Sequence, residues 1–477
     1  MPISPTFRKK THRTKPKSSS YSSTIKNRFE SYLTHLLSKK DIQRLAEATG
    51  FVKRSSSQLD GNIFVRALLT AALDTRYYSL EGLCGLIREL DRGVDIRPQS
   101  LMERINKPEA AAFLEAVEKR SIERQIQEKL ACFPSALLKK FPKLLIQDST
   151  VINLHEKLQT EFKGSGGRAS KSALKIDLIY DLVANKIEST ILTDMRRMDQ
   201  TLAREVLKFV EKDHLVIRDL GYSNYSNLED VQKRGGFFLC RFKSGLLVYL
   251  HPDDKDPIDL AGYINKKYRH ENVIDLEVYI TTEKFKVRMI AYRAPQEVVD
   301  TRRRKANATA KKQGRALQKS TLDLMSFTIL LTNVSREIWK AKIVGSIYRL
   351  RWMIELVFKQ WKSEIKVDYL PGINRDRIKC LIFSKLLAVT IMNQAYRLAH
   401  EYGRKQHKID VSISKAMKWL RNNNRLANVI KMGWNAKFAE LFLNEIKKTM
   451  AKQNRRRKTI LQVVEEGLSY VEGMELA

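Results

Sequence analysis

The middle of the chain alternates short apolar runs with helical stretches, and this alternation restricts the fold more than any other feature of the sequence. From about residue 141 the strand-like runs are "KLLIQDST", "ALKIDLIYDLV", "KIESTILTD", "HLVIRDLGYSN" and "GFFLCRF". The helix-like stretches "DQTLAREVLKFVEK" and "YSNLEDVQKRG" lie between the later runs. Strands interleaved with helices in this way predict a mixed α/β domain.

This α/β texture is interrupted once and is flanked by helical sequence on both sides. The runs "LLVYLHP", "VIDLEVYITT" and "FKVRMIAYRA" look like a small β-rich insertion, after which the strand "SFTILLTNV" resumes the core. We therefore predict a basic arm over 1–22, a helical N-terminal domain over 23–133, a first core part over 134–244, a β-rich insertion over 245–326, a second core part over 327–400 and a basic helical region over 401–477.

One helix of the second core part is unusual, because polar residues gather on one side of an otherwise apolar surface. At about 100° per residue, Tyr348, Arg351, Glu355 and Lys362 fall within roughly 60° of one another, and we call these four residues the polar ridge. Lys359 lies near the same arc. Apolar residues cover the other sides: Trp352, Ile354, Leu356, Val357, Phe358 and Trp361. Such a helix is buried on most sides, so the polar ridge faces something that tolerates charge. The plainer alternative is a salt-bridged surface face, in which Glu and Lys contribute a few tenths of a kcal/mol.

The charge balance of the whole chain indicates what the polar ridge faces. The sequence has 88 Lys and Arg against 53 Asp and Glu, a formal charge of +35. Such an excess attracts a polyanion, with nucleic acid as the first expectation and a membrane surface as the alternative. The sequence has no segment of 18 continuous apolar residues, so we do not expect a membrane-spanning helix. The basic start is not followed by the apolar stretch that is typical of a secretory signal. The four cysteines, Cys84, Cys132, Cys240 and Cys380, lack metal-type or redox-type spacing, which favours reduced thiols in a cytoplasmic protein.

Two aspartates follow apolar runs in similar ways. Asp148 ends "LLIQ" and Asp219 ends "LVIR", each before small polar residues or glycine. Either aspartate alone could cap a turn or end a strand. With Glu355 they make three carboxylates, the oxygen ligands that a pair of Mg²⁺ ions prefers. Two such ions can support the in-line displacement of a phosphoryl group.

These residues carry a specific resemblance. The order "IQDST", "IRDLGYSN" and Y-x2-R-x3-E-x6-K resembles the DDE-class transposases of bacterial insertion sequences, in particular the large family with the Y-R-E-K signature. Tyr348, Arg351, Glu355 and Lys362 match that signature without a gap, and "LLTNV", "LRW" and "FKQWKS" are also typical. The resemblance covers roughly residues 60 to 400. It implies an RNase H-like core with a β-rich insertion between the second aspartate and the glutamate.

The same resemblance implies roles for single residues. Asp148, Asp219 and Glu355 would be the catalytic, metal-binding triad for two Mg²⁺ ions, which Mn²⁺ could replace. Tyr348, Arg351 and Lys362, with Lys359 beside them, would contact DNA phosphates near the cut. In some family members an aromatic residue stabilises a base flipped out of the duplex, and Phe327 is the nearest candidate.

The N-terminal helical region offers a weaker signal. "SLEGLCGLIREL", a turn with Gly93 and "RPQSLMERIN" have the outline of a helix-turn-helix. Base contacts would then come from Gln99, Ser100, Glu103 or Arg104. Any small helical domain offers similar turns, so a purely structural role for this outline is the stronger alternative.

The resemblance implies a cytoplasmic transposase that binds the inverted ends of its element. It would cleave them with a metal-activated water and join the 3′-hydroxyls to target DNA in a cut-and-paste reaction. Joining two ends in one event implies a homodimer, without a membrane or a small-molecule substrate. The alternatives are an RNase H-fold nuclease or resolvase that does not join strands, a decayed transposase acting as a repressor, and a basic RNA-binding or structural protein.

Overall fold

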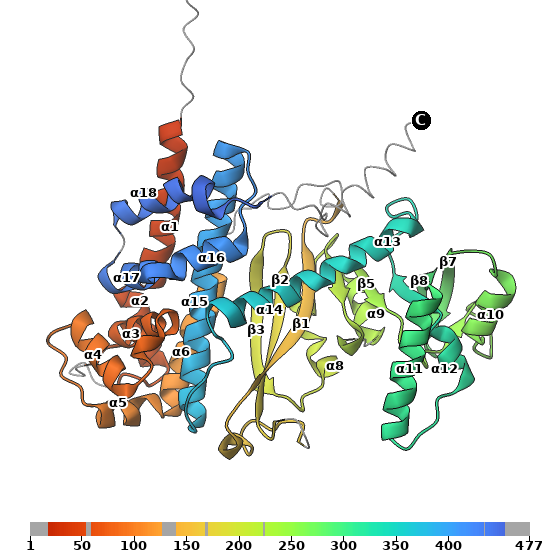
Figure 1. Cartoon of the computed structure of the whole chain (residues 1–477), viewed down its shortest axis with the longest axis horizontal. Helices are drawn as coiled ribbons and strands as arrows, with labels where there is room; N and C mark the ends of the chain where they lie inside the picture. Colours follow the sequence, from red (N-terminus) through yellow and green to blue (C-terminus); the bar gives the residue numbers. More distant parts are fainter. Residues whose placement is uncertain are drawn as a thin grey trace, which may run out of the picture.

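A computed structural model of the chain describes residues 18–53, 59–125, 140–166, 170–222, 225–433 and 435–453. Within these ranges a sheet of parallel and antiparallel strands lies beside helices from both ends of the sequence (Figure 1). The predicted fold class is confirmed as an α/β core with helical regions at both ends of the sequence. Residues 1–17 of the predicted arm lie outside the described residues, and a helix already begins at Ser18.

The sheet has nine described strands in the order β3-β2-β1-β4-β5-β9-β8-β7-β6. β1 pairs antiparallel with β2 and parallel with β4, and β4 in turn pairs parallel with β5. Helices cover this part of the sheet, so β2 is buried along its whole length. The strands span β1 Leu144–Asn153, β2 Ala173–Asp181, β3 Lys186–Asp194, β4 Leu215–Arg218, β5 Phe237–Arg241, β6 Val248–Tyr249, β7 Val273–Ile280, β8 Phe285–Arg293 and β9 Phe327–Thr332.

The segment 245–326 does not form a separate β body. Its strands β6, β7 and β8 continue the same sheet, because β9 pairs with β5 on one side and with β8 on the other. Six residue pairs, from Arg288↔Thr332 to Arg293↔Phe327, make the second junction. The segment also holds three helices: α10 Leu260–Lys267, α11 Gln296–Lys312 and α12 Lys319–Leu324.

The helices of both chain ends pack around one long central helix, α15. Asn374 caps its start by accepting from two backbone N–H groups, and Ser79 caps α4 by accepting from the Gly82 N–H. The remaining helices are α1 Ser18–Leu36, α2 Lys39–Ala48, α3 Gly61–Leu73, α4 Leu80–Leu90, α5 Pro98–Ile105, α6 Pro108–Glu123, α8 Asp199–Leu202, α9 Tyr225–Lys233, α13 Ala341–Tyr348, α14 Trp352–Glu364, α15 Arg375–Tyr402, α16 Ile413–Arg421, α17 Arg425–Met432 and α18 Ala436–Glu445.

Among the described residues, one helix is long and apolar enough to cross a membrane, the continuous helical stretch Arg375–His407 that contains α15. Its apolar window is 94% buried within the protein. The apolar surface of this helix is therefore accounted for by packing inside the protein.

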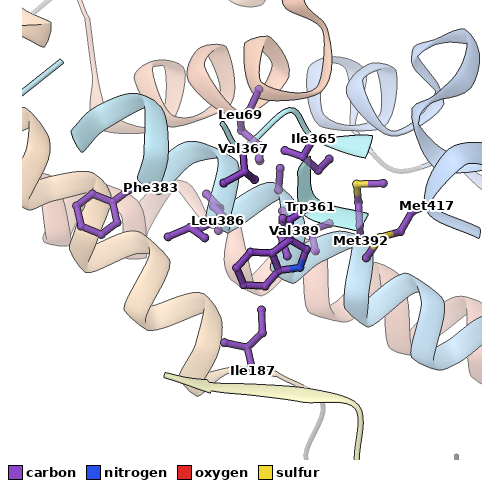
Figure 2. Packing of buried hydrophobic residues seen from close by; sticks show 14 of the residues in the cluster. Leu69, Ile187, Trp361, Ile365, Val367, Phe383, Leu386, Val389, Met392 and Met417 are labelled. Atoms are coloured by element: carbon purple, nitrogen blue, oxygen red, sulfur yellow. The ribbon is translucent and has the colours of Figure 1, made fainter. Parts of the chain in front are cut away.

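Helix α14 crosses the sheet over β1 and joins it to the helical regions (Figure 1). Figure 2 shows Trp361 of α14 among Leu386 and Val389 of α15, with Ile187 of β3 and Met417 of α16 nearby. Since Trp361 is almost fully buried, its burial contributes about 1.5–3 kcal/mol. This packing fixes α14, which carries Glu355 and Lys362 of the polar ridge.

The N-terminal region contains the helix-turn-helix outline predicted from the sequence. Helix α5 begins at Pro98, and Gln99, Ser100 and Glu103 are exposed on it. Arg104 is instead held inward, because its Nη2 donates to the Phe51 carbonyl at 3.2 Å and its guanidinium lies over the Phe51 ring. Of the four predicted base-reading residues, Arg104 is thus engaged within the domain.

Candidate active site

Asp148 and Asp219 are brought together by the parallel pairing of β1 and β4. The last paired residues are Gln147 and Arg218, so the next residue on each strand is one of the two aspartates. Asp219 follows the end of β4, as expected. Asp148 does not end its strand, because β1 continues antiparallel to β2 as far as Asn153. It lies instead where β1 loses its neighbour β4, and this leaves room beside its side chain.

The polar ridge lies over the sheet and contacts these two aspartates. Tyr348 ends α13, Arg351 lies in the following 3₁₀ turn Arg349–Arg351, and Glu355 is in the first turn of α14. The Tyr348 hydroxyl donates to Asp219 Oδ1 at 3.1 Å. Helix and sheet thus meet in a direct polar contact at this point.

Arg351 is the centre of the site. Its Nη1 donates to Asp148 Oδ2 at 3.2 Å, its Nη2 donates to Glu355 Oε1 at 2.7 Å, and its Nε lies 3.9 Å from Asp219 Oδ1. The side chain of Arg351 is only 16% exposed. Glu355 therefore does pair with Arg351, but in a half-buried cluster that includes both aspartates. The simple surface bridge considered for this helix does not describe the arrangement.

The electrostatics of the cluster follow from burial and crowding of carboxylates. Burial raises the pKa of Asp148 to about 6, although the Ser149 N–H and Arg351 oppose the shift. The nearby Asp219 and Glu355 raise the same pKa further. Burial works to lower the pKa of Arg351, but the surrounding carboxylates outweigh it and raise the pKa. A cation at this point stabilises three anions that would otherwise repel one another.

An open cavity of about 690 Å³ adjoins the carboxylates. Asp148 and Glu355 line it together with Lys359 and Lys362 of α14. Lys359 is exposed, and the Lys362 ammonium approaches the Val151 carbonyl of β1 at 3.4 Å. The cavity therefore has carboxylates at one end and lysines along one wall.

The donor set suits a hard divalent cation, since three carboxylates from three elements surround one centre. In the arrangement described, the guanidinium lies between the carboxylates. Within the described ranges no three Asp, Glu, His or Cys residues are already grouped as metal ligands. Asp148, Asp219 and Glu355 are the residues that would hold a metal ion, and Arg351 supplies the positive charge between them.

Two aromatic predictions turn out differently. Phe327 is only 4% exposed and lies under the Arg293 guanidinium, so the prediction that it offers its ring to a flipped base is wrong for this structure. Trp352 was expected among the packed apolar residues but is 49% exposed beside Arg351. The helical wheel contained the signal for this exposure, because Trp352 lies only about 40° from Tyr348.

The three cysteines within the described residues take no part in the site. Cys84, Cys240 and Cys380 are buried free thiols, and burial raises the pKa of the Cys240 thiol to about 12. Cys132 lies outside the described residues. The three described thiols are therefore poor nucleophiles and poor metal ligands at neutral pH.

Comparison with known proteins places the site in a family context. Residues 139–391, just over half of the chain, match the family model described as "Transposase DDE domain". The chain is 25% identical to the transposase of insertion sequence IS231B from Bacillus thuringiensis subsp. berliner over 410 residues, 83% of this chain and 85% of the relative. It is 27% identical to the IS231C transposase of the same organism, covering 80% of this chain and 82% of the relative.

A shorter match is the IS1151 transposase of Clostridium perfringens, 27% identical over 53% of this chain and 56% of the relative. Among solved structures, a piggyBac transposase synaptic complex with hairpin DNA aligns with 92% of this chain and 87% of that chain. Its TM-score is 0.45 at 10% sequence identity. At that TM-score the likeness does not establish a shared fold.

Proposed function

Since this chain belongs to the DDE transposases of bacterial insertion sequences, we propose that Asp148, Asp219 and Glu355 are its catalytic carboxylates. The observation that carries the proposal is their convergence on Arg351 from β1, from the turn after β4 and from α14. Three carboxylates from distant parts of the chain crowd like charges together here, an arrangement that is typical of a functional site. The triad is therefore the part of the chain that would act on DNA phosphates.

In this proposal the chain's own residues divide the work. The three carboxylates would hold two Mg²⁺ ions, which Mn²⁺ could replace, and bound ions would supply activation of the attacking oxygen and stabilisation of the leaving oxygen. Tyr348 orients Asp219 through its hydroxyl. Lys359 and Lys362 line the cavity beside the carboxylates, where they and Arg351 can contact the phosphates of the transposon end.

The reaction proposed is cut-and-paste transposition. The enzyme binds the terminal inverted repeats of its own insertion sequence, hydrolyses a phosphodiester at each end and directs the freed 3′-hydroxyl to target DNA. Positioning and charge stabilisation suffice for such phosphoryl transfer, without a covalent protein intermediate. Because two ends must react together, we propose a homodimer in the synaptic complex, acting on DNA in the bacterial cytoplasm.

The test uses the full chain and linear DNA that carries the element's own ends. Asp148→Asn, Asp219→Asn and Glu355→Gln should each abolish metal-dependent cleavage and leave DNA binding largely intact, because basic residues elsewhere hold the DNA. Glu229→Gln, on the exposed surface of α9, is the matched control and should cleave normally. Residual Mg²⁺-dependent nicking by a folded Asp219→Asn protein would overturn the assignment.

The same preparation separates the rival functions. Pre-cleaved ends incubated with target plasmid should give strand-transfer products. Cleavage without joining would indicate a nuclease or resolvase. Binding to the ends without any cleavage would indicate a decayed transposase that acts as a repressor.

A further inference from the structure

A buried polar layer lies on the face of β1 opposite to Asp148. Side chains alternate along a strand, so Gln147 and Ser149 both point away from the candidate metal site. Asp177 of β2 is the register partner of Ser149 and is fully buried. The Gln147 amide donates to Asp177 Oδ2 at 3.0 Å. The residue that precedes the first catalytic aspartate is thus fastened to this buried carboxylate.

The other oxygen of Asp177 fastens the second aspartate's segment. The Tyr222 hydroxyl donates to Asp177 Oδ1 at 2.5 Å, and Tyr222 is almost fully buried. Tyr222 lies in the 3₁₀ turn that follows Asp219, and its N–H donates to the Asp219 carbonyl at 3.1 Å. One buried carboxylate therefore ties together the two chain segments that carry Asp148 and Asp219.

A second acidic residue supports the same two segments. Asp199, at the start of α8, accepts from the Lys175 ammonium at 3.0 Å, and its Oδ1 lies 3.4 Å from the Ser149 hydroxyl. A Cβ added at Gly221, within the turn after Asp219, would come 3.1 Å from Asp199 Oδ2. The turn therefore packs closely on Asp199, which also contacts β1 through Ser149.

The position of Asp177 is costly unless it serves a purpose. A buried carboxylate is unfavourable without donors, and burial raises the pKa of Asp177 to about 6, while the bonds from Tyr222 and Gln147 lower it. A leucine at this site would satisfy the apolar surroundings of β2 but would make neither bond. The two donors are noteworthy because each lies within three residues of a candidate metal ligand.

We propose that Asp177 and Tyr222 are positioning residues that fix the separation of Asp148 and Asp219 for metal binding. The inference rests on the proposed function, since it assigns these residues a role toward that site. Residues that orient metal ligands typically change metal affinity by 10–100-fold when they are removed. A merely structural role would instead change stability and leave the metal affinity of the folded protein unchanged.

The test measures Mn²⁺ binding to the full-length protein by electron paramagnetic resonance, together with the thermal midpoint. Tyr222→Phe removes one hydroxyl and should weaken Mn²⁺ binding by roughly 10-fold or more. Tyr180→Phe is the matched control, because Tyr180 is also buried and its hydroxyl donates to Asn185 Oδ1 at 2.6 Å, away from the triad. Equal Mn²⁺ affinity in the two folded variants would overturn the inference.

A second pair of variants decides the matter if the Tyr222→Phe protein does not fold. Asp177→Asn keeps an oxygen acceptor for the Tyr222 hydroxyl, whereas Asp177→Ala does not, so the alanine variant should lose more Mn²⁺ affinity. A folded Asp177→Ala protein with wild-type affinity would overturn the inference. Glu355→Gln distinguishes this failure from that of the proposed function. If it binds Mn²⁺ as the wild type does, the triad itself is wrong.

Discussion

Lys385 offers a prediction whose magnitude can be worked out from the structure. Its side chain is fully buried in α15, and its ammonium donates to the Tyr369 carbonyl at 2.7 Å and to the carbonyls of Ile365 and Lys366. It also lies over the ring of Tyr78, 5.0 Å from its centroid. These contacts connect the end of α14 to α15 and to the N-terminal region. Replacing Lys385 with Met removes the charge and keeps much of the volume.

The expected effect depends on pH in a definite direction. Burial lowers the pKa of Lys385 from 10.5 to about 7, against the attraction of Asp368. Below pH 7 the lysine is charged in both the folded and the unfolded state. Between pH 7 and 10.5 the unfolded state binds more protons, so the free energy of unfolding rises with pH. At 1.36 kcal/mol per pKa unit, the gain between pH 7 and pH 9.5 is about 3 kcal/mol.

The assay is equilibrium unfolding in urea at several pH values between 7 and 9.5. The wild type should gain about 3 kcal/mol relative to Lys385→Met over this range. Other titrating groups cancel in the difference, and the loss of carbonyl partners in the variant shifts the curve without changing its slope. Lys418→Met removes an exposed lysine of α16 and is the control. Parallel pH curves for the wild type and Lys385→Met would refute the reasoning.

Three further predictions follow from the charges of the molecule. In EDTA, Arg351→Ala should lower the free energy of unfolding by about 2 kcal/mol. Mg²⁺ should raise the thermal midpoint of this variant more than that of the wild type. A loss of only a few tenths of a kcal/mol would indicate a mere surface bridge. Burial raises the pKa of Glu118 to about 7, so stability is lost as pH rises through that value. Glu118→Gln should gain about 2.5 kcal/mol relative to the wild type between pH 5 and pH 8 in urea unfolding, and an unchanged difference would contradict this. Deleting residues 1–17 should weaken binding to all DNA sequences alike and flatten the salt dependence, by about 0.9 in slope for each phosphate that the segment neutralises; weaker binding to the element's ends alone would show that this segment reads sequence.

The family and the fold class could be predicted from the sequence because both rest on local patterns. Alternating apolar runs indicated the strands, and the Y-R-E-K spacing indicated the resemblance, which the family model and the IS231 relatives confirm. The continuation of the sheet into β8, β7 and β6 could not be predicted. A strand's own sequence does not specify its neighbour, and β9 pairs with strands from both sides of the segment 245–326.

The contacts within the candidate site were only partly accessible from the sequence. The helical wheel placed Arg351 on the same face as Glu355, but it contained no information on Asp148, more than 200 residues away. The pair Asp177 and Tyr222 could not be found from the sequence. In "ALKIDLIYDLV" a buried aspartate has the same spacing as an aspartate on the solvent-exposed face of a strand. Such pairs emerge only when the register of β1 and β2 is known.

The packing of α14 holds the charged residues of the polar ridge in place without help from their own ion pairs. The helix is held by Trp361 in the core and, beyond its end, by Lys385 bonded to the carbonyls of residues 365, 366 and 369. Neither contact involves the polar ridge. The position of Glu355 is therefore set by packing that does not depend on Arg351. In the proposed function, the guanidinium would exchange carboxylates for DNA phosphates while the helix keeps its place over β1.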